Sequence, residues 1–394
     1  MSIIRTSLRQ FVSTTRASLL QSLKAPKPLH IVIGNESVDI DSFACSVLYA
    51  YYTPTPTAPF LSMPRVDLTL KPELHHLLTL LQISPEDLLF IDDPPLSALP
   101  KSTRITLVDH NELEPALRAY FQEANVRGII DHHEDEGGSP NAKPRIIERS
   151  GSCASLVTNY FKEVFPTSGA VRGELARLGL AAALIDTTNL TNKVTEHDLS
   201  TVGFLEGVIN GMPVGPGGEK WDRQKFFNGI WDAKNDIDHM PLRDLLRKDW
   251  KEWTEGDGKK VGIAAILKDL DWLGSRQGQD TFLQGIKSWA QERELDLVSV
   301  MTTIGQGDEF KRELMVWALD DSVKESVATF EEKAQKADLR LQTWGEGGLD
   351  SKDGDRKAWR QFNLVASRKQ VSPLLRESLR EVAVEVKGGR ESKV

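Results

Sequence analysis

Four short motifs rich in aspartate and histidine lie where predicted strands or helices of this chain end, and their side chains could bind divalent metal ions. They are residues 34–41 (GNESVDID), 108–112 (VDHNE), 130–133 (IDHH) and 184–188 (LIDTT). The first three follow short apolar runs typical of buried strands, and the fourth ends an apolar helical segment. Ionised carboxylates are costly to desolvate in such places unless they are paired or bind a metal. Carboxylate and imidazole together suit Mg²⁺ or Mn²⁺.

Each motif taken alone also has a simpler interpretation. An aspartate after a strand is often a helix N-cap, and a pair of histidines is often exposed or satisfied by hydrogen bonds. Four motifs at element ends are harder to explain in this way, because converging carboxylates repel one another unless a cation lies between them. Asp39 and Asp41 are two residues apart, so in an extended loop they could approach one side together.

Elements that could position these motifs alternate along the first half of the chain. Apolar runs predict strands at residues 29–34, 88–91, 105–109, 128–131 and 145–148. Helical periodicity predicts helices at residues 41–52, 72–81, 114–125, 152–165 and 172–186. This alternation predicts a parallel sheet with helices on both faces, in which sites form beyond the carboxyl ends of the strands.

The Gly/Pro-rich run NGMPVGPGGEK indicates a linker between two domains, as the chain length of 394 residues also suggests. We expect a first domain at 1–210, a linker at 211–221 and a smaller α/β domain at 222–394. In the second domain we predict strands at 260–266, 297–303, 314–319 and 361–366, and helices at 242–252, 281–294, 322–341 and 373–386.

The composition is that of an ordinary globular protein, with 40% apolar and 27% charged residues. Its two cysteines, Cys45 and Cys153, are too few for a disulfide framework and indicate a reducing, intracellular compartment. No apolar run approaches ~18 residues, which argues against a membrane span. Residues 1–35 hold five basic residues and no acidic one, typical of a mitochondrial transit peptide or of an amphipathic first helix, and we favour the helix.

Charge is unevenly distributed along the chain. Residues 36–221 hold 25 acidic and 14 basic residues, a net charge of −11, whereas residues 222–394 hold 32 acidic and 30 basic residues. An acidic first half is a poor partner for a polyanion unless cations lie between them, which is a further indication of bound metal.

The order of the four motifs resembles that of the DHH phosphoesterases. Within that superfamily the chain is similar to the branch of family II inorganic pyrophosphatases and fungal cytosolic exopolyphosphatases. Residues 241–249 (PLRDLLRKD) and 367–371 (SRKQV) resemble motifs of that branch's substrate-binding DHHA2 domain. The resemblance extends from about Ile31 to the final helix, and it implies a parallel-sheet DHH domain followed by a smaller DHHA2-like α/β domain.

The resemblance also implies a two-metal centre. One ion would be held by Asn35, Asp39 and Asp109. The other would be held by Asp41, Asp109, His132 and Asp186, with Asp109 bridging the two. His133 would face the substrate phosphate, and the second domain would bind phosphate through Lys251, Arg368 and Lys369. The expected ions are Mg²⁺, with Mn²⁺ or Co²⁺ as substitutes.

The residue at position 35 bears on the substrate. Pyrophosphatases of this branch carry histidine where this chain has Asn35, whereas exopolyphosphatases resemble this sequence in having asparagine. A neutral oxygen ligand favours Mg²⁺ over Mn²⁺ or Co²⁺. We therefore expect an exopolyphosphatase that releases orthophosphate from the end of inorganic polyphosphate, using water activated by two metal ions.

Three alternatives remain from the same superfamily: an inorganic pyrophosphatase, a nucleotide phosphodiesterase and a non-catalytic regulatory relative. The phosphodiesterase branch carries a GGGH-type motif that this sequence lacks, and the chain does not have the basic charge typical of nucleic-acid binding. Regulatory relatives often have an altered DHH triplet, which is intact here as Asp131-His132-His133. We expect a cytoplasmic or, alternatively, mitochondrial monomer with no nucleic-acid or membrane partner.

Overall fold

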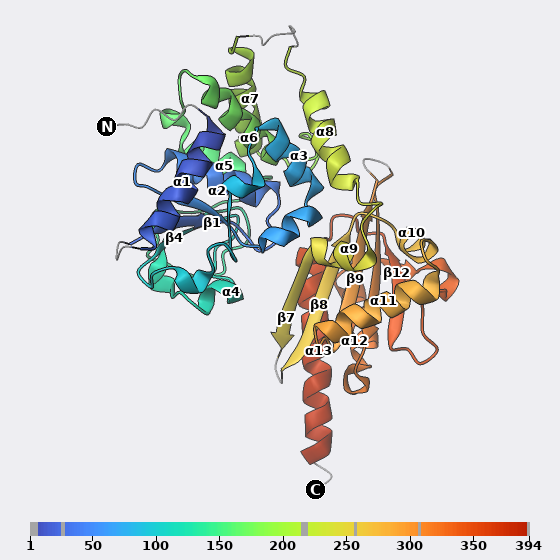
Figure 1. The fold of residues 1–394 in the computed structure, drawn as a ribbon. Coiled ribbons are helices and arrows are strands. Elements are labelled where there is room, and N and C mark those ends of the chain that lie inside the picture. Colours follow the sequence, from blue (N-terminus) through green and yellow to red (C-terminus); the bar gives the residue numbers. More distant parts are fainter. Residues whose placement is uncertain (1–6, 25–27, 214–219, 256–257, 306–308, 392–394) are drawn as a thin grey trace. The chain divides into compact units, whose positions relative to one another are not determined.

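A computed structural model describes residues 7–24, 28–213, 220–255, 258–305 and 309–391 (Figure 1). The chain divides into two compact units, Met1–Asp236 and Ile237–Val394. Most of the linker expected at 211–221 lies outside the described residues. Helix α8 (Arg223–Asn235) follows it and packs on α3 (Pro72–Leu80) and α6 (Ala170–Asp186), which is why the division falls after Asp236.

The first unit is built on a six-stranded parallel sheet in the order β3-β2-β1-β4-β5-β6. The strands are β1 His30–Ile33, β2 Ala58–Leu61, β3 Leu89–Phe90, β4 Arg104–Val108, β5 Val126–Asp131 and β6 Arg145–Ile147. The chain runs outward in one direction from β1 to β3 and in the other from β4 to β6. Strands β1 and β4 therefore form a topological switch point, where the connections leave a crevice at the carboxyl edge of the sheet.

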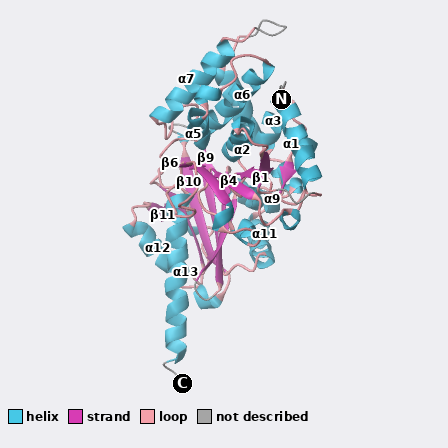
Figure 2. Ribbon diagram, turned by 90° about the vertical axis from the view of Figure 1, so that its left-hand side faces the viewer, coloured by secondary structure: helices cyan, strands magenta, loops and turns pink. Residues whose placement is uncertain are grey.

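Helices cover both faces of this sheet, as the strand–helix alternation predicted. They are α1 Leu8–Ser22, α2 Ile40–Tyr52, α3, α4 Pro115–Arg118, α5 Cys153–Tyr160, α6, α7 Glu196–Asn210 and α8. Successive strand residues point to opposite faces. Val32 thus shares a core with residues of α2, α5 and α6, whereas Ile31 and Ile33 share one with residues of the last turns of α1 and of α4. Figure 2 shows α2, α5 and α6 together on one side of β1 and β4.

The second unit has its own six-stranded mixed sheet in the order β11-β12-β10-β9-β8-β7. Its strands are β7 Trp250–Glu255, β8 Lys259–Ile266, β9 Leu297–Ile304, β10 Lys311–Ala318, β11 Leu341–Thr343 and β12 Arg356–Gln361. Strands β8 and β9 are parallel, and every other neighbouring pair is antiparallel.

The helices of the second unit cover the two faces of its sheet separately. One core contains residues of α9 (Leu242–Lys248), α10 (Leu270–Ser275) and α11 (Gln279–Glu292). The other contains residues of α12 (Ser326–Lys336) and α13 (Arg368–Glu391). Among the described residues, none of the helices combines the length and the apolar character that crossing a bilayer requires.

Several predicted elements differ from those observed. The expected strand at 361–366 is wrong, because β12 ends at Gln361, and the expected helix at 114–125 is only the single turn α4 and a 3₁₀ turn at Glu123–Asn125. The expected helix at 242–252 ends at Lys248, since the residues WKEWTE that follow alternate as the edge strand β7. Strand β2 was missed because its four residues follow the run TPTPT, which is typical of a loop.

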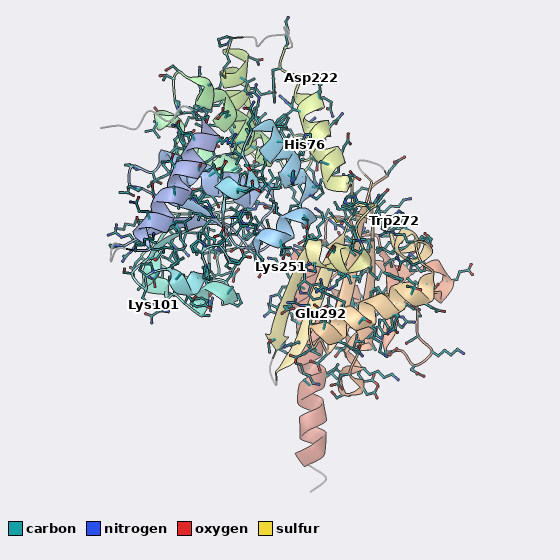
Figure 3. The ribbon with its side chains drawn as sticks, in the orientation of Figure 1. His76, Lys101, Asp222, Lys251, Trp272 and Glu292 are labelled. Atoms are coloured by element: carbon teal, nitrogen blue, oxygen red, sulfur yellow. The ribbon has the colours of Figure 1, made fainter. Side chains whose placement is uncertain are left out.

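Strand β7 carries Lys251 (Figure 3) and pairs with β8. The Trp250 ring lies in close contact with the backbone of Gly262. A methyl group at position 262 would overlap the indole ring. We therefore expect Gly262→Ala to destabilise the second unit by ~1–3 kcal/mol through overpacking. That loss corresponds to a fall of several degrees in Tm, measurable by calorimetry.

Gly274→Ala is the matched control in the same unit. Among the described residues, nothing lies within 4 Å of a Cβ built at Gly274, which is inside α10. Because alanine is favoured over glycine in a helix, this variant should melt at the wild-type temperature or above it. Equal melting of the two variants would contradict the proposed packing of Trp250.

Candidate metal centre

Three of the four acidic motifs meet at the carboxyl edge of the first sheet because the strands that precede them are neighbours. Asn35 follows β1, Asp109 follows β4, and His132 follows β5, and these strands lie in the order β1-β4-β5 (Figure 1). Asparagine and aspartate therefore converge at the switch point, with the histidine one strand further along. This is the location that parallel-sheet topology predicts for a binding site.

Asp109 lies at the middle of the cluster and is 2% exposed. Its Oδ2 accepts hydrogen bonds from Asn35 Nδ2 at 2.7 Å and Ser42 Oγ at 2.6 Å. Its Oδ1 lies 3.3 Å from His132 Nε2. The backbone of Asp109 is left-handed, with φ of 61°, a conformation that non-glycine residues adopt mainly where the surrounding structure enforces it.

The electrostatics of Asp109 are those of a carboxylate that lacks a counter-charge. Burial, followed by the charges of Asp41 and Asp39, raises its pKa to about 7. The hydrogen bond from His132 acts in the opposite direction but does not compensate. A divalent cation would stabilise the ionised form and turn this repulsive cluster into a ligand set.

Asp39 and Asp41 lie at the start of α2, and not in the extended loop that we expected. Asp39 is the N-cap, and its Oδ1 accepts from the Ser42 amide at 2.9 Å, whereas Asp41 lies in the first turn. Val38 precedes them with φ of 41°, an unusual value for a β-branched residue. The loop after β1 is therefore strained at the point where it presents these carboxylates, which is common at functional sites.

The N-terminus of α5 holds Asp41. The carboxylate accepts from the amides of Cys153 at 2.7 Å and Ala154 at 2.8 Å, and from Ser152 Oγ at 2.8 Å. The start of α5 therefore binds an anion, as helix N-termini commonly do, and this anion is a carboxylate of the same chain.

The fourth motif brings Asp186 to the same place. Asp186 ends α6, and its carboxyl lies within hydrogen-bonding reach of that of Asp41. Burial, then the charges of Asp41 and Asp39, raise the pKa of Asp186 well above its usual value. Two carboxyls in contact cannot both ionise without a cation, so this pair, like Asp109, needs a nearby cation for its ionised form.

The two histidines are held by different partners. His132 Nδ1 lies 3.0 Å from the carbonyl of Ser150, so it donates there and Nε2 is left as the atom that faces Asp109. His133 Nδ1 lies 2.7 Å from Asp131 Oδ1. Burial by itself would raise the pKa of Asp131, but hydrogen bonds from His133 and Asn111 lower it to about 2.

These residues fit a divalent metal centre. Ligand atoms of Asp109, His132 and His133 lie within 4.8 Å of one another, and the carboxylates of Asp39, Asp41 and Asp186 are near enough to interact with the charge of Asp109. The fit of Asn35 is less direct. Its amide nitrogen faces Asp109, while its oxygen, the expected ligand atom, accepts from Ser37 Oγ at 2.6 Å. Ligation through oxygen would require the amide to rotate.

Sequence reasoning missed two residues that orient the centre. Ser42 donates to Asp109 and receives the backbone N–H of Asn35, and Asn111 donates to Asp131 Oδ2 at 2.6 Å. Asn111 lies within the VDHNE motif, so its position was a usable signal. Ser42 gave none, because a serine in the first turn of a helix is common.

The three predicted phosphate-binding residues lie in the second unit. Arg368 begins α13 and forms an ion pair of 2.8 Å with Asp249, the residue before β7. Lys251 follows on β7, and exposed Lys369 is in the first turn of α13. The start of α13 and the start of β7 therefore present these cations from one part of the unit.

Comparison with known families agrees with this division of the chain. Residues 30–183 match the sequence profile of the DHH family N-terminal domain, and residues 228–378 match that of the DHHA2 domain. The DHH match falls within the first compact unit, and the DHHA2 match, apart from residues 228–236, falls within the second.

Individual relatives are similar over much of the chain. A Schizosaccharomyces pombe protein named "Putative exopolyphosphatase" is 38% identical, over 89% of this chain and 91% of its own. A manganese-dependent inorganic pyrophosphatase of Methanothrix thermoacetophila is 28% identical, over 51% of this chain and 60% of its own. The crystal structure of a Methanococcus jannaschii "putative family II inorganic pyrophosphatase" superposes with a TM-score of 0.57 at 20% identity, covering 89% of this chain and 99% of that one. This last similarity shows the fold.

The raised pKa of Asp109 predicts how the metal-free protein responds to pH. Folded Asp109 keeps its proton up to about pH 7, whereas an unfolded aspartate loses it near pH 4. The folded state therefore binds more protons in this range, and stability falls as pH rises through it. At ~1.4 kcal/mol per pKa unit, the loss is a few kcal/mol at neutral pH.

Asp109→Asn removes this charge. In excess EDTA at about pH 7.5, we expect the variant to melt at a higher temperature than the wild type, with the difference disappearing near pH 4. Added Mn²⁺ should raise the Tm of the wild type far more than that of the variant. Thermal unfolding followed by circular dichroism measures both effects. A variant that melts lower than the wild type throughout this pH range would contradict the repulsion described here.

Proposed function

The chain belongs to the DHH family of hydrolases and carries a DHHA2 domain, and on this basis we propose that it is an exopolyphosphatase. Its substrate would be inorganic polyphosphate, and each cycle would release one orthophosphate from the chain end. The observation that carries the proposal is the convergence of Asp41, Asp109, His132 and Asp186, which a divalent metal would neutralise. The choice of polyphosphate rests on the S. pombe relative's name and on Asn35.

We assign the ligands as the motifs imply. One ion would be held by Asn35, Asp39 and Asp109, and the other by Asp41, Asp109, His132 and Asp186. The relatives named for manganese dependence support the use of divalent metal, and we propose Mg²⁺ because carboxylate and amide oxygens predominate. Such ions, when bound, supply a water of lowered pKa and neutralise phosphate charge.

His133 is suited to transfer a proton to the leaving phosphate. Its Nδ1 is bound to Asp131, whose low pKa keeps that carboxylate ionised, and this hydrogen bond fixes the orientation of the imidazole ring. With Nδ1 engaged, Nε2 is the atom left to donate to a phosphoryl oxygen. Such a proton transfer would favour departure of the shortened polyphosphate chain.

The first turn of α13 is suited to bind phosphate. Arg368 and Lys369 both lie at the positive end of the helix dipole, where cations are unfavourable unless an anion is also present. Arginine provides a planar fork of donors for phosphate, and here Asp249 orients the fork by accepting from Nη1 through its carbonyl and pairing with Nη2 through its carboxylate. Lys251 would add a third positive charge.

A direct comparison of substrates tests the proposal. Orthophosphate release is measured in Mg²⁺ with long-chain polyphosphate and pyrophosphate, and nucleotide release with single-stranded DNA, and Asp109→Asn serves as the inactive control. We expect polyphosphate to be the best substrate, with most remaining chains still long after early turnover, because attack occurs at the end. Faster hydrolysis of pyrophosphate would favour the pyrophosphatase alternative, and hydrolysis of none of the three would favour the regulatory one.

The phosphate-binding role predicts the kinetics of Arg368→Ala. Loss of charge-assisted hydrogen bonds worth ~1.5–3 kcal/mol should lower kcat/KM about 10- to 100-fold. Both a higher KM and a lower kcat are expected, since the phosphates are held in the ground state and in the transition state. Exposed Arg360 on β12 provides the matched control, and Arg360→Ala should behave as wild type. Equal kinetics for the two variants would exclude Arg368 from substrate binding.

A further inference from the structure

Asp198 is a buried carboxylate in the first turn of α7, and the mechanism above gives it no role. It is fully buried and accepts six hydrogen bonds. The donors are the Ser150 hydroxyl, the Gly151 and Ser152 amides, the Ser155 hydroxyl, and the amide and hydroxyl of Thr195. A carboxylate offers about four lone-pair directions, so this group is fully used within the protein.

Capping of α7 explains only part of this arrangement. Thr195 and Asp198 form a capping box, in which Asp198 accepts from the Thr195 amide. The Thr195 hydroxyl donates to the same carboxylate, so Thr195 supplies two of the six hydrogen bonds. The other four come from residues 150–155, which lie more than 40 positions earlier in the chain. Asp198 therefore joins α7 to the loop that leads into α5.

The contact between this loop and Asp198 is close and charged. A Cβ built at Gly151 would lie 2.7 Å from Asp198 Oδ2 and 2.8 Å from the Lys193 carbonyl, so a larger residue would displace the loop. Burial by itself would raise the pKa of Asp198, but hydrogen bonds from Ser155 and Thr195 hold it below the usual value. The group is thus an ionised acceptor that fixes the backbone of residues 150–152.

The same loop holds two predicted metal ligands. The carbonyl of Ser150 binds His132 Nδ1, and the Ser152 hydroxyl binds Asp41. The next two amides, of Cys153 and Ala154, also bind Asp41. Both ligands belong to the second ion of the proposed pair. Among the described residues, Asn35 and Asp39 of the first ion make no hydrogen bond to this loop.

We propose that Asp198 is a positioning residue for the second metal ion: by fixing residues 150–152 it orients His132 and Asp41 without touching the ion. The inference rests on the proposed metal centre. It makes the affinity for the second ion, and not for the first, depend on Asp198. Loss of Asp198 should weaken the second ion selectively. Groups that orient metal ligands typically change metal affinity by about 10- to 100-fold.

Titration of the metal-free full chain with Mn²⁺ by calorimetry tests this without any substrate. We expect two ions to bind to the wild type. In Asp198→Asn one affinity should fall by about 10- to 100-fold while the other changes less than about twofold. His132→Gln identifies the affected ion, because it removes a ligand of the second ion directly. Adding Asp198→Asn to His132→Gln should then cause little further loss, since both act on one site.

Glu206→Gln is the matched control. Glu206 is on the same helix, and its carboxylate pairs with Arg223 and Trp221, away from the 150–152 loop. Both Mn²⁺ affinities should be unchanged in this variant. Ser155→Ala keeps the charge of Asp198 and removes one donor, so it should weaken the same ion by a smaller factor. If Asp198→Asn does not fold, Ser155→Ala decides the question.

The inference is overturned if Asp198→Asn binds both ions as the wild type does, or if it weakens both ions equally. A wild-type chain that binds fewer than two ions overturns it together with the metal assignment. Two bound ions without hydrolysis of polyphosphate would reject the proposed function and leave the role of Asp198 intact.

Discussion

Mutual repulsion among buried carboxylates is the constraint on which the first unit depends. Asp109 is buried with Asp41 and Asp39 near it, and Asp186 is in contact with Asp41. Each of these carboxylates would be more stable in water, so bringing them together lowers the free energy of unfolding of the unit. A divalent cation makes this clustering favourable, because the carboxylates that repel one another become its ligands. The metal centre and the stability of the unit are therefore physically coupled.

The fold orients these charges with a helix dipole and with hydrogen bonds from neutral groups. The first turn of α5 donates two amides to Asp41, and Ser42 and Asn35 donate to Asp109. Neutral donors orient a carboxylate but leave its charge available to a metal, whereas an arginine would neutralise it. The parallel sheet makes this possible because loops from adjacent strands meet at one edge. Asp198 acts one contact further from the proposed metal. It is an ionised acceptor that fixes residues 150–152, and this loop in turn binds His132 and Asp41.

The second unit carries the proposed phosphate-binding cations and has a separate sheet with its own two cores. Its cations are presented by the beginning of a helix and by an edge strand, which need no partner from the first unit to form. Arg368 is oriented by Asp249 within the same unit.

The sequence by itself determined the parallel sheet of the first unit and the identity of the motifs around Asp109, because apolar runs ending in aspartate are visible without coordinates. It also indicated Arg368 and Lys369 through their motif. It did not determine β2, β7 or the limits of β12, since short edge elements with prolines or alternating tryptophans carry weak local signals. Only the tertiary structure decided which atoms face Asp109, that α5 binds Asp41, and that Asp198 reaches residues 150–155. These contacts join segments that are distant in the chain, and their geometry depends on packing that no local pattern encodes.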